Sequence, residues 1–177
     1  DWTLGDPRDP APWLGPMVRP RNADMVRRQL TAATAAGARG LIDARKFPAA
    51  SQGGAWLAPQ LMVDVDHTMD LMREETFGPV AGIMRVESDE EAVRLANDSR
   101  YGLTASIWSQ DIERSAALAR QLDVGTVFVN RCDYLDPGLA WTGVKDTGRG
   151  TTLSSLGFHE LTRPRSMHFR LPAGMES

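Results

Sequence analysis

The spacing of apolar side chains near the start of the chain is helical. In residues 23–36, Met25 and Leu30 lie toward one face of a helix, and charged side chains lie toward another. Asn22 is the expected N-terminal cap and Gly37 the expected stop, because these residue types favour helix ends. The pattern predicts one amphipathic helix after a proline-rich entry.

Short apolar stretches follow, separated by turns and by two further amphipathic segments. The expected strands are residues 39–43, 56–65, 79–87, 102–109, 126–130 and, at the end, 163–172. Pro59 makes the second of them an edge or irregular strand. The expected helices are residues 88–98, opened by a Ser88–Glu91 capping box, and residues 112–122, capped by Asp111.

Strands that alternate with helices of about ten residues are typical of α/β folds with right-handed crossovers. We therefore predict an α/β fold with an open, mostly parallel sheet and flanking helices. Ligands of such sheets bind at the carboxyl ends of the strands. The glycine-rich segment after residues 126–130 is accordingly a candidate for chemistry.

Composition narrows the classes of partner. The 177 residues are 42% hydrophobic and 24% charged, which is ordinary for a soluble globular protein, and no apolar run reaches the roughly 18 residues of a membrane span. A formal charge of −3 without a basic tract argues against nucleic acid and anionic membranes and favours a small-molecule ligand. The chain lacks an initiator Met, so we expect a piece of a longer protein.

The titratable residues exclude two kinds of site. Cys132 is the only cysteine, which excludes an internal disulfide framework and a cysteine zinc cluster and suits a reducing compartment, the cytoplasm. The three histidines are scattered without metal-ligand spacing, so no metal site is predicted. Glu74 and Glu75 stand side by side before an aromatic, a glycine and a proline, either as a solvated charge pair or as part of a site.

Five motifs resemble, in order, the C-terminal part of an NAD(P)-dependent aldehyde dehydrogenase. They are EETFGPV (74–80), YGLTASIWSQD (101–111), GTVFVN (125–130), GVKDTGRG (143–150) and LGFHELTRPRS (156–166). The resemblance extends over about residues 5–167. Each motif is weak alone, and their order makes the signal strong.

The resemblance implies a cofactor contact at the acidic turn. Glu75 matches the family's carboxylate that accepts hydrogen bonds from the ribose next to the nicotinamide, and Phe77 matches the aromatic beside the ring. An ionised carboxylate can accept from both hydroxyls of a ribose diol. The implied cofactor is NAD or NADP.

The resemblance also implies a tunnel for a small-molecule aldehyde. The matching positions are Arg131, Leu135 and Trp141, and the aromatic Trp141 suits a hydrophobic substrate body. Ala140 and Thr142 depart from the proline and glycine that the family has in this loop. The family's catalytic cysteine, general-base glutamate and oxyanion asparagine all precede the region that matches, so no catalytic residue is assigned.

Cys132 could substitute as a nucleophile, since Arg131 is adjacent, but it does not match the family position, and a spectator role is favoured. We expect residues 1–162 to be the C-terminal portion of a catalytic domain and residues 163–177 an oligomerisation strand of a homodimer or homotetramer. The fragment alone is expected to be inactive. The alternative is a non-catalytic module that acts in binding or oligomerisation.

Overall fold

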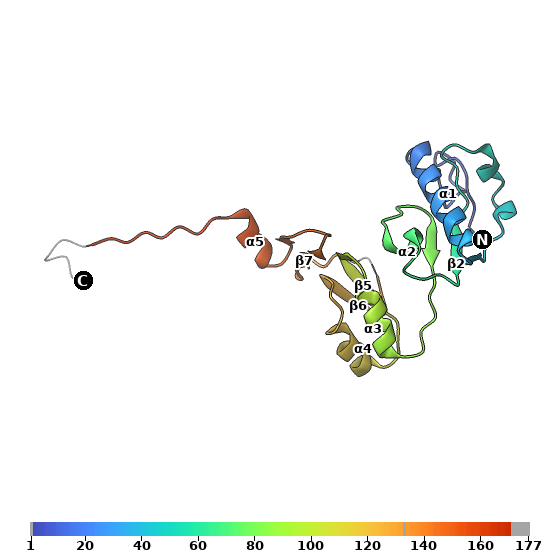
Figure 1. Ribbon diagram of the computed structural model, residues 1–177. Helices are drawn as coiled ribbons and strands as arrows, with labels where there is room; N and C mark the ends of the chain where they lie inside the picture. Colours follow the sequence, from blue (N-terminus) through green and yellow to red (C-terminus); the bar gives the residue numbers. More distant parts are fainter. Residues whose placement is uncertain (1, 133, 171–177) are drawn as a thin grey trace. The chain divides into compact units, whose positions relative to one another are not determined.

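The computed structural model describes residues 2–132 and 134–170 of the chain, which divides into two compact units, Asp1–Ala92 and Val93–Ser177. Figure 1 shows the helices and strands of each unit in sequence colours. No helix within the described ranges has the length and apolar character needed to cross a bilayer.

The first helix, α1 (Pro20–Ala35), organises the first unit. It begins before the expected cap: Pro20 occupies the first turn, where its fixed φ suits a helix and its missing N–H costs nothing, and the cap is Arg19. The cap predicted at Asn22 is therefore wrong. The stop is confirmed, since Gly37 adopts a φ of 107° and its N–H donates to the Thr34 carbonyl at 3.1 Å.

A three-stranded sheet follows α1. β1 (Arg39–Gly40) is antiparallel to β2 (Gln60–Val63), which is parallel to β3 (Val80–Gly82). The 3-10 helices η1 (Ala44–Lys46) and η2 (Pro48–Gln52) lie between β1 and β2. β2 begins directly after Pro59, which cannot donate to a ladder, and lies between β1 and β3. The edge position predicted for this strand is therefore wrong, because the proline lies outside the paired residues.

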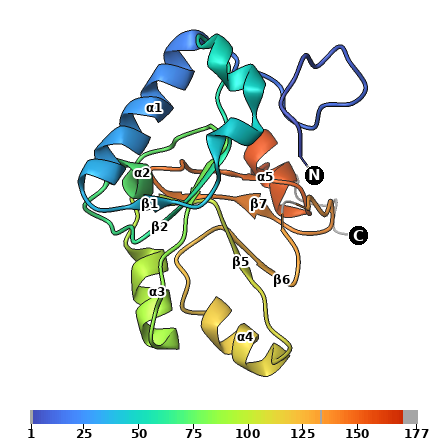
Figure 2. The ribbon, with the colours of Figure 1, turned by 90° about the vertical axis from the view of Figure 1, so that its right-hand side faces the viewer.

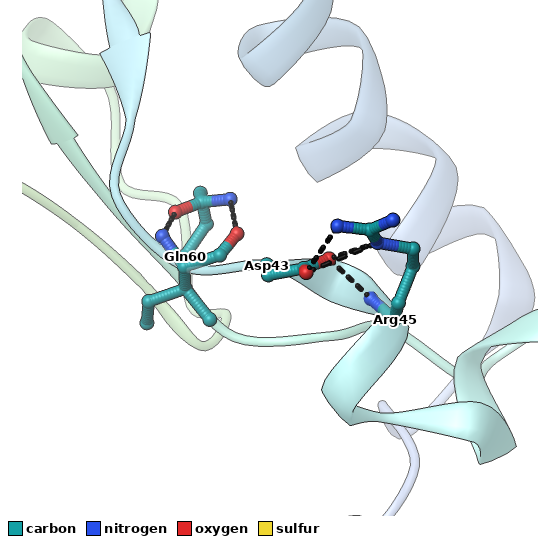
Figure 3. A network of polar contacts seen from close by, with 4 residues as sticks. Asp43, Arg45 and Gln60 are labelled. Atoms are coloured by element: carbon teal, nitrogen blue, oxygen red, sulfur yellow. Dashed lines mark hydrogen bonds and ion pairs between the residues drawn. The ribbon is translucent and has the colours of Figure 1, made fainter.

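The side chain of Gln60 extends the β1–β2 pairing (Figure 3). Its Oε1 accepts from the Ile42 N–H at 2.8 Å, and its Nε2 donates to the Ile42 carbonyl at 2.9 Å. A Cβ on Gly40 would lie 2.9 Å from the Gln60 amide carbon, so glycine makes room for this amide. Beside it, Asp43 caps η1 by accepting from the Arg45 N–H at 3.0 Å.

The core of the first unit lies under α1. Its buried side chains form two clusters, Ala33, Ala38, Met62, Val65, Met69 and Leu71, and Ala23, Val26 and Leu57. Leu71 belongs to the short helix α2 (Asp70–Arg73), from which the acidic turn departs. Burial of α2 against this core therefore sets where the acidic turn starts.

The second unit contains a β-α-β crossover. β5 (Thr104–Ile107) pairs in parallel with β6 (Thr126–Val129), and α4 (Ile112–Ala119) connects them, as can be followed in Figure 2. The Asp111 cap is confirmed, because its Oδ1 accepts from the Arg114 N–H at 2.9 Å. The helix α3 (Asp89–Asn97), which spans the division between the units, is opened by Ser88, whose Oγ accepts from the Glu91 N–H at 3.2 Å.

Two antiparallel pairs hold the glycine-rich segment. β4 (Tyr101–Gly102) pairs with β8 (Val144–Lys145), and β7 (Trp141–Thr142) pairs with β9 (Thr151–Thr152) ahead of α5 (Leu156–Leu161). Gly125 lies against this segment so closely that a Cβ there would be 1.7 Å from the Thr142 carbonyl oxygen. Only glycine fits at this point.

Helices and strands do combine in an α/β arrangement, but the sheets differ from the expected single, mostly parallel one. The named strands of the described ranges form one three-stranded and three two-stranded sheets, and only β2–β3 and β5–β6 are parallel. Residues 162–170 are exposed and carry no assigned strand, while 171 and 172 of the expected terminal strand lie outside the described residues.

Candidate cofactor and substrate site

The acidic turn, residues 74–79, is held at both ends by backbone hydrogen bonds. The Glu74 N–H donates to the Asp70 carbonyl of α2 at 2.9 Å, and the Pro79 carbonyl accepts from the Gln60 N–H at 2.9 Å. Glu75 and Phe77 lie between these points and are both exposed. The turn thus presents the two predicted cofactor residues from a fixed backbone.

Two contacts with α1 fix the middle of the turn. The Thr76 Oγ1 donates to Oε1 of Gln29, a side chain that is only 8% exposed, at 3.0 Å. A Cβ on Gly78 would lie 2.9 Å from Cγ2 of Val26, so the backbone passes close over the helix. Sequence reasoning missed Gln29; the one available signal is a polar residue on the buried face of an amphipathic helix.

Phe77 has an unusual backbone and an unusual exposure. Its φ is 44°, in the left-handed region that bulky side chains avoid, and its ring is 82% exposed. A strained position persists only where its surroundings impose it, and such positions gather at ligand sites. Here the contacts of Thr76 with Gln29 and of Gly78 with Val26, on either side of Phe77 in the sequence, hold the backbone in this conformation.

A hollow of about 420 Å³ borders the acidic turn; we call it the Glu75 hollow. It is lined by Met25, Arg28, Gln29 and Ala32 of α1 and by Asp70, Glu74 and Glu75. A second hollow, of about 480 Å³, is lined by Phe77 and by residues 16–19, 21 and 22, and we call it the Phe77 hollow. Glu75 and Phe77 thus line different hollows.

The three predicted substrate residues belong to the second unit. Arg131 and Leu135 are exposed, and the Arg131 guanidinium stacks 3.7 Å above the Tyr134 ring, while the Arg131 carbonyl accepts from the Ser106 Oγ. Leu135 is 58% exposed. Cys132, next to Arg131, is a free and exposed thiol.

Trp141 has a different setting. It is half-buried on β7. Together with the glycine-rich loop, residues 147–152, it lines a hollow of about 350 Å³. Arg131 and Leu135 do not line this hollow. Gly148 and Gly150 have φ values of 117° and 101°, which agrees with their interpretation as turn glycines. The structure therefore separates Trp141 from the other two substrate residues.

No group of three or more His, Cys, Asp or Glu side chains that could hold a metal ion occurs within residues 2–132 and 134–170. The Glu75 hollow is lined by three carboxylates, those of Asp70, Glu74 and Glu75, and by the guanidinium of Arg28, whereas the charged side chains that line the Phe77 hollow are Arg19 and Arg21.

Comparison with known proteins identifies the family. Residues 1–167 match the model of the "Aldehyde dehydrogenase family". The chain belongs to this family. The resemblance carried by the five motifs is thereby confirmed, and the family match extends over almost the whole chain.

Two curated relatives illustrate the similarity. The NADP/NAD-dependent aldehyde dehydrogenase PuuC of Escherichia coli (strain K12) is 35% identical over 98% of this chain and 34% of the relative. The succinate semialdehyde dehydrogenase [NAD(P)+] Sad of the same organism is 40% identical over 89% of this chain and 33% of the relative. The chain thus spans about a third of the length of these relatives.

Solved structures of aldehyde dehydrogenases are also similar to this chain. The crystal structure of Mycobacterium tuberculosis aldehyde dehydrogenase complexed with NAD+ superposes with a TM-score of 0.86 at 30% identity, covering 99% of this chain and 36% of that one. Succinic semialdehyde dehydrogenase from Streptococcus pyogenes, solved with NADP+, gives a TM-score of 0.76 at 32% identity, covering 89% of this chain and 34% of that one. An aldehyde dehydrogenase member of the α/β class therefore accounts for both sequence and fold.

Proposed function

We propose that this chain is the C-terminal portion of the catalytic domain of an NAD(P)-dependent aldehyde dehydrogenase. The parent oxidises an aldehyde to a carboxylic acid through a thioester on a cysteine upstream of this chain. The observation that carries the proposal is the acidic turn, in which a strained and exposed Phe77 and an exposed Glu75 are braced against α1. NAD or NADP, when bound, supplies the hydride acceptor.

In this proposal Glu75 holds the nicotinamide ribose. Its carboxylate is exposed and lines the Glu75 hollow, where it can accept from two adjacent hydroxyls. Phe77 offers an exposed ring against which the nicotinamide packs. Bracing of the turn by Gln29 and Val26 limits the positions that the two side chains can take, and such fixed positioning favours a near-reactive geometry.

The proposed substrate wall of the parent includes Arg131 and Leu135 from one part of the second unit and Trp141, which lines a different hollow, from another. Leu135 contributes exposed apolar surface, and Trp141 a half-buried ring. Arg131 keeps its guanidinium on the Tyr134 ring and so restricts its own reach. Aldehydes with an apolar body suit this wall better than small hydrated ones.

The remaining parts of the proposal concern assembly and location. Residues 163–177 form an oligomerisation strand of a dimer or tetramer; in support, residues 162–170 are exposed, and Met167 and Phe169 are 69% and 75% exposed. The single free cysteine suits a cytoplasmic protein. The 177-residue chain by itself is expected to have no dehydrogenase activity, because no nucleophile or general base is assigned in it.

The test is Glu75→Gln in the full-length parent. Loss of the carboxylate removes charge-assisted hydrogen bonds to the ribose, so hydride transfer falls by about 10- to 100-fold, the equivalent of one or two such bonds. Glu74→Gln is the matched control, because it makes the same chemical change one residue earlier. Unchanged steady-state kinetics with both NAD(P) and aldehyde in Glu75→Gln would remove Glu75 from the site.

A second candidate is a non-catalytic module that binds or assembles. It is favoured by an apolar hollow of about 430 Å³ in the first unit, lined among others by Trp2, Leu14, Phe47 and Leu61, since exposed apolar surface of this kind marks interaction sites. The mass and N-terminal sequence of the native gene product separate the two candidates. An upstream extension that carries a nucleophilic cysteine supports the enzyme, and a native start at Asp1 supports the module.

A further inference from the structure

We propose that Gln29 is a second binding residue of the Glu75 hollow, where its side-chain Nε2 donates a hydrogen bond to a hydroxyl oxygen of the ligand that Glu75 holds. This inference rests on the proposed function, in which that ligand is the ribose next to the nicotinamide of the cofactor. Gln29 lies on α1 and belongs to none of the five family motifs.

Gln29 is buried but uses only part of its hydrogen-bonding capacity. Its side chain is 8% exposed, and its Oε1 accepts from the Thr76 Oγ1 at 3.0 Å. Within residues 2–132 and 134–170, its Nε2 has no hydrogen-bond partner. Burying an amide costs stability unless its donors are satisfied. Since an apolar side chain of similar length would fill this space without that cost, packing alone does not account for a glutamine here.

The unused donor has access to the Glu75 hollow. Gln29 and Glu75 both line this hollow of about 420 Å³. In the described part of the chain, the fully buried side-chain polar atom without a partner is Oγ1 of Thr126, so Nε2 of Gln29 keeps contact with open space. The bond from Thr76 fixes the plane of the amide and joins it to the residue next to Glu75. The amide and the carboxylate are therefore within reach of one small ligand.

These two groups are complementary to a hydroxyl. A carboxylate only accepts hydrogen bonds and Nε2 only donates them, whereas a hydroxyl does both. A hydroxyl that donates to Glu75 can therefore accept from Gln29. The three carboxylates of the hollow, those of Asp70, Glu74 and Glu75, outnumber the single guanidinium of Arg28, which disfavours anionic ligand groups. The ligand group that fits is an uncharged one with neighbouring hydroxyls, such as a ribose.

A purely structural role of Gln29 leads to a different expectation. If the residue only braces the acidic turn through Thr76, loss of either partner should weaken all ligands alike, whichever hydroxyls they carry. If Nε2 contacts the ligand, loss of Gln29 removes one particular hydroxyl contact, and loss of the Thr76 hydroxyl does not. Ligands that lack one hydroxyl therefore separate the two roles, because only groups in contact show a coupling energy.

The test measures binding to the full-length parent by calorimetry, with NAD(P) and with its two analogues that each lack one hydroxyl of the nicotinamide ribose. Wild type should prefer the intact ribose over both analogues. In Gln29→Met, which keeps the length of the side chain and removes the amide, the preference over one analogue should fall by about 2- to 10-fold, the equivalent of one neutral hydrogen bond. In Thr76→Val both preferences should stay within about twofold of wild type.

A second variant guards against misfolding of Gln29→Met. Gln29→Glu keeps the oxygen that accepts from Thr76 and, when ionised, has no donor in place of Nε2, so it should lose the same preference while the turn stays braced. The matched control is Gln52→Met, which changes an exposed glutamine of the same unit that lines neither hollow and should keep both preferences.

Two results overturn the binding role of Gln29: wild-type preferences in both Gln29 variants, or an equal loss of preference in Thr76→Val. Glu75→Gln tests the proposed function separately. If it abolishes the preference for the intact ribose while the Gln29 variants keep it, the role of Glu75 stands and that of Gln29 does not. Equal binding of NAD(P) and both analogues by wild type counts against both residues.

Discussion

The hydrogen bond between Thr76 and Gln29 offers a direct measure of how the acidic turn is held. Thr76→Val removes the Oγ1 donor and preserves the branched shape, so packing changes little while the Gln29 Oε1 loses a partner 3.0 Å away. Gln29 is 8% exposed, so water replaces that partner poorly. The change isolates one hydrogen bond between α1 and the turn.

The expected loss of stability in Thr76→Val follows from the burial of the acceptor, Gln29 Oε1. Leaving a buried polar group unsatisfied costs about 1–3 kcal/mol, and partial exposure of Thr76 places this case at about 1–2 kcal/mol. Replacing both partners leaves no orphaned group, so the double change T76V/Q29L should cost less than the sum of the two single changes. A coupling energy of about 1 kcal/mol is expected between these contacting residues.

Hydrogen exchange measured by mass spectrometry is the suitable assay, because it reports on each unit separately. In Thr76→Val, peptides that cover residues 20–35 and 74–80 should exchange about 5- to 30-fold faster, which corresponds to 1–2 kcal/mol of local stability. Peptides of residues 104–129 serve as the internal reference. Thr31→Val, the same change at an exposed position of α1, should have no effect beyond a few tenths of a kcal/mol.

Two outcomes would contradict this role of the bond: unchanged exchange at residues 74–80 in Thr76→Val, or simple additivity of the effects of Thr76→Val and Gln29→Leu. Either result would mean that the bond does not brace the turn. The exposed and strained Phe77 would then need another explanation.

Three further outcomes are expected. Gly125→Ala should destabilise the second unit by about 1–3 kcal/mol or prevent its folding, because the new Cβ falls 1.7 Å from the Thr142 carbonyl oxygen; urea unfolding measures this. Gln60→Glu should cost about 1 kcal/mol and speed exchange near Ile42, since a carboxylate cannot donate to the Ile42 carbonyl. The side-chain hydrogen bond from Arg8 lowers the pKa of Asp6 to about 2. The contribution of this carboxylate to folding stability is therefore present above pH ~4 and lost as the pH falls through about 2. An NMR titration of Asp6 measures this pKa.

Each of these outcomes has a counterpart that should behave differently. Gly138→Ala places a Cβ only against a flexible carboxylate at 3.2 Å and should be tolerated, whereas an equal loss in both glycine variants would contradict the steric argument. Gln60→Leu, which loses the two hydrogen bonds to Ile42 and the one that Oε1 accepts from the Leu61 N–H, should be worse than Gln60→Glu. An Arg8→Gln chain in which Asp6 still titrates near pH 2 would show that another group lowers the pKa of the carboxyl.

Features that depend on neighbours in sequence were predictable. Gly37 ends α1, Asp111 caps α4, and β6 lies where the apolar run predicted it, because capping and periodicity act over a few residues. The error at Asn22 has a local cause as well, because Pro20 suits the first turn of a helix and moves its start to Arg19. The five ordered motifs were likewise sufficient to indicate the family that the comparison established.

Features that depend on distant contacts came only from the tertiary structure. The helical pattern indicates at most that Gln29 is a polar residue on a buried face, and it does not show that its partner is Thr76, 47 residues away. The left-handed φ of Phe77 and the close passage of Gly125 against Thr142 are not visible in the spacing or composition of the sequence. The same holds for the division of strands among small sheets and for the separation of Glu75 and Phe77 into differently charged hollows. Residue type and spacing determined which elements form; packing across the chain decided which side chains meet, because those contacts are selected by burial and fit rather than by local propensity.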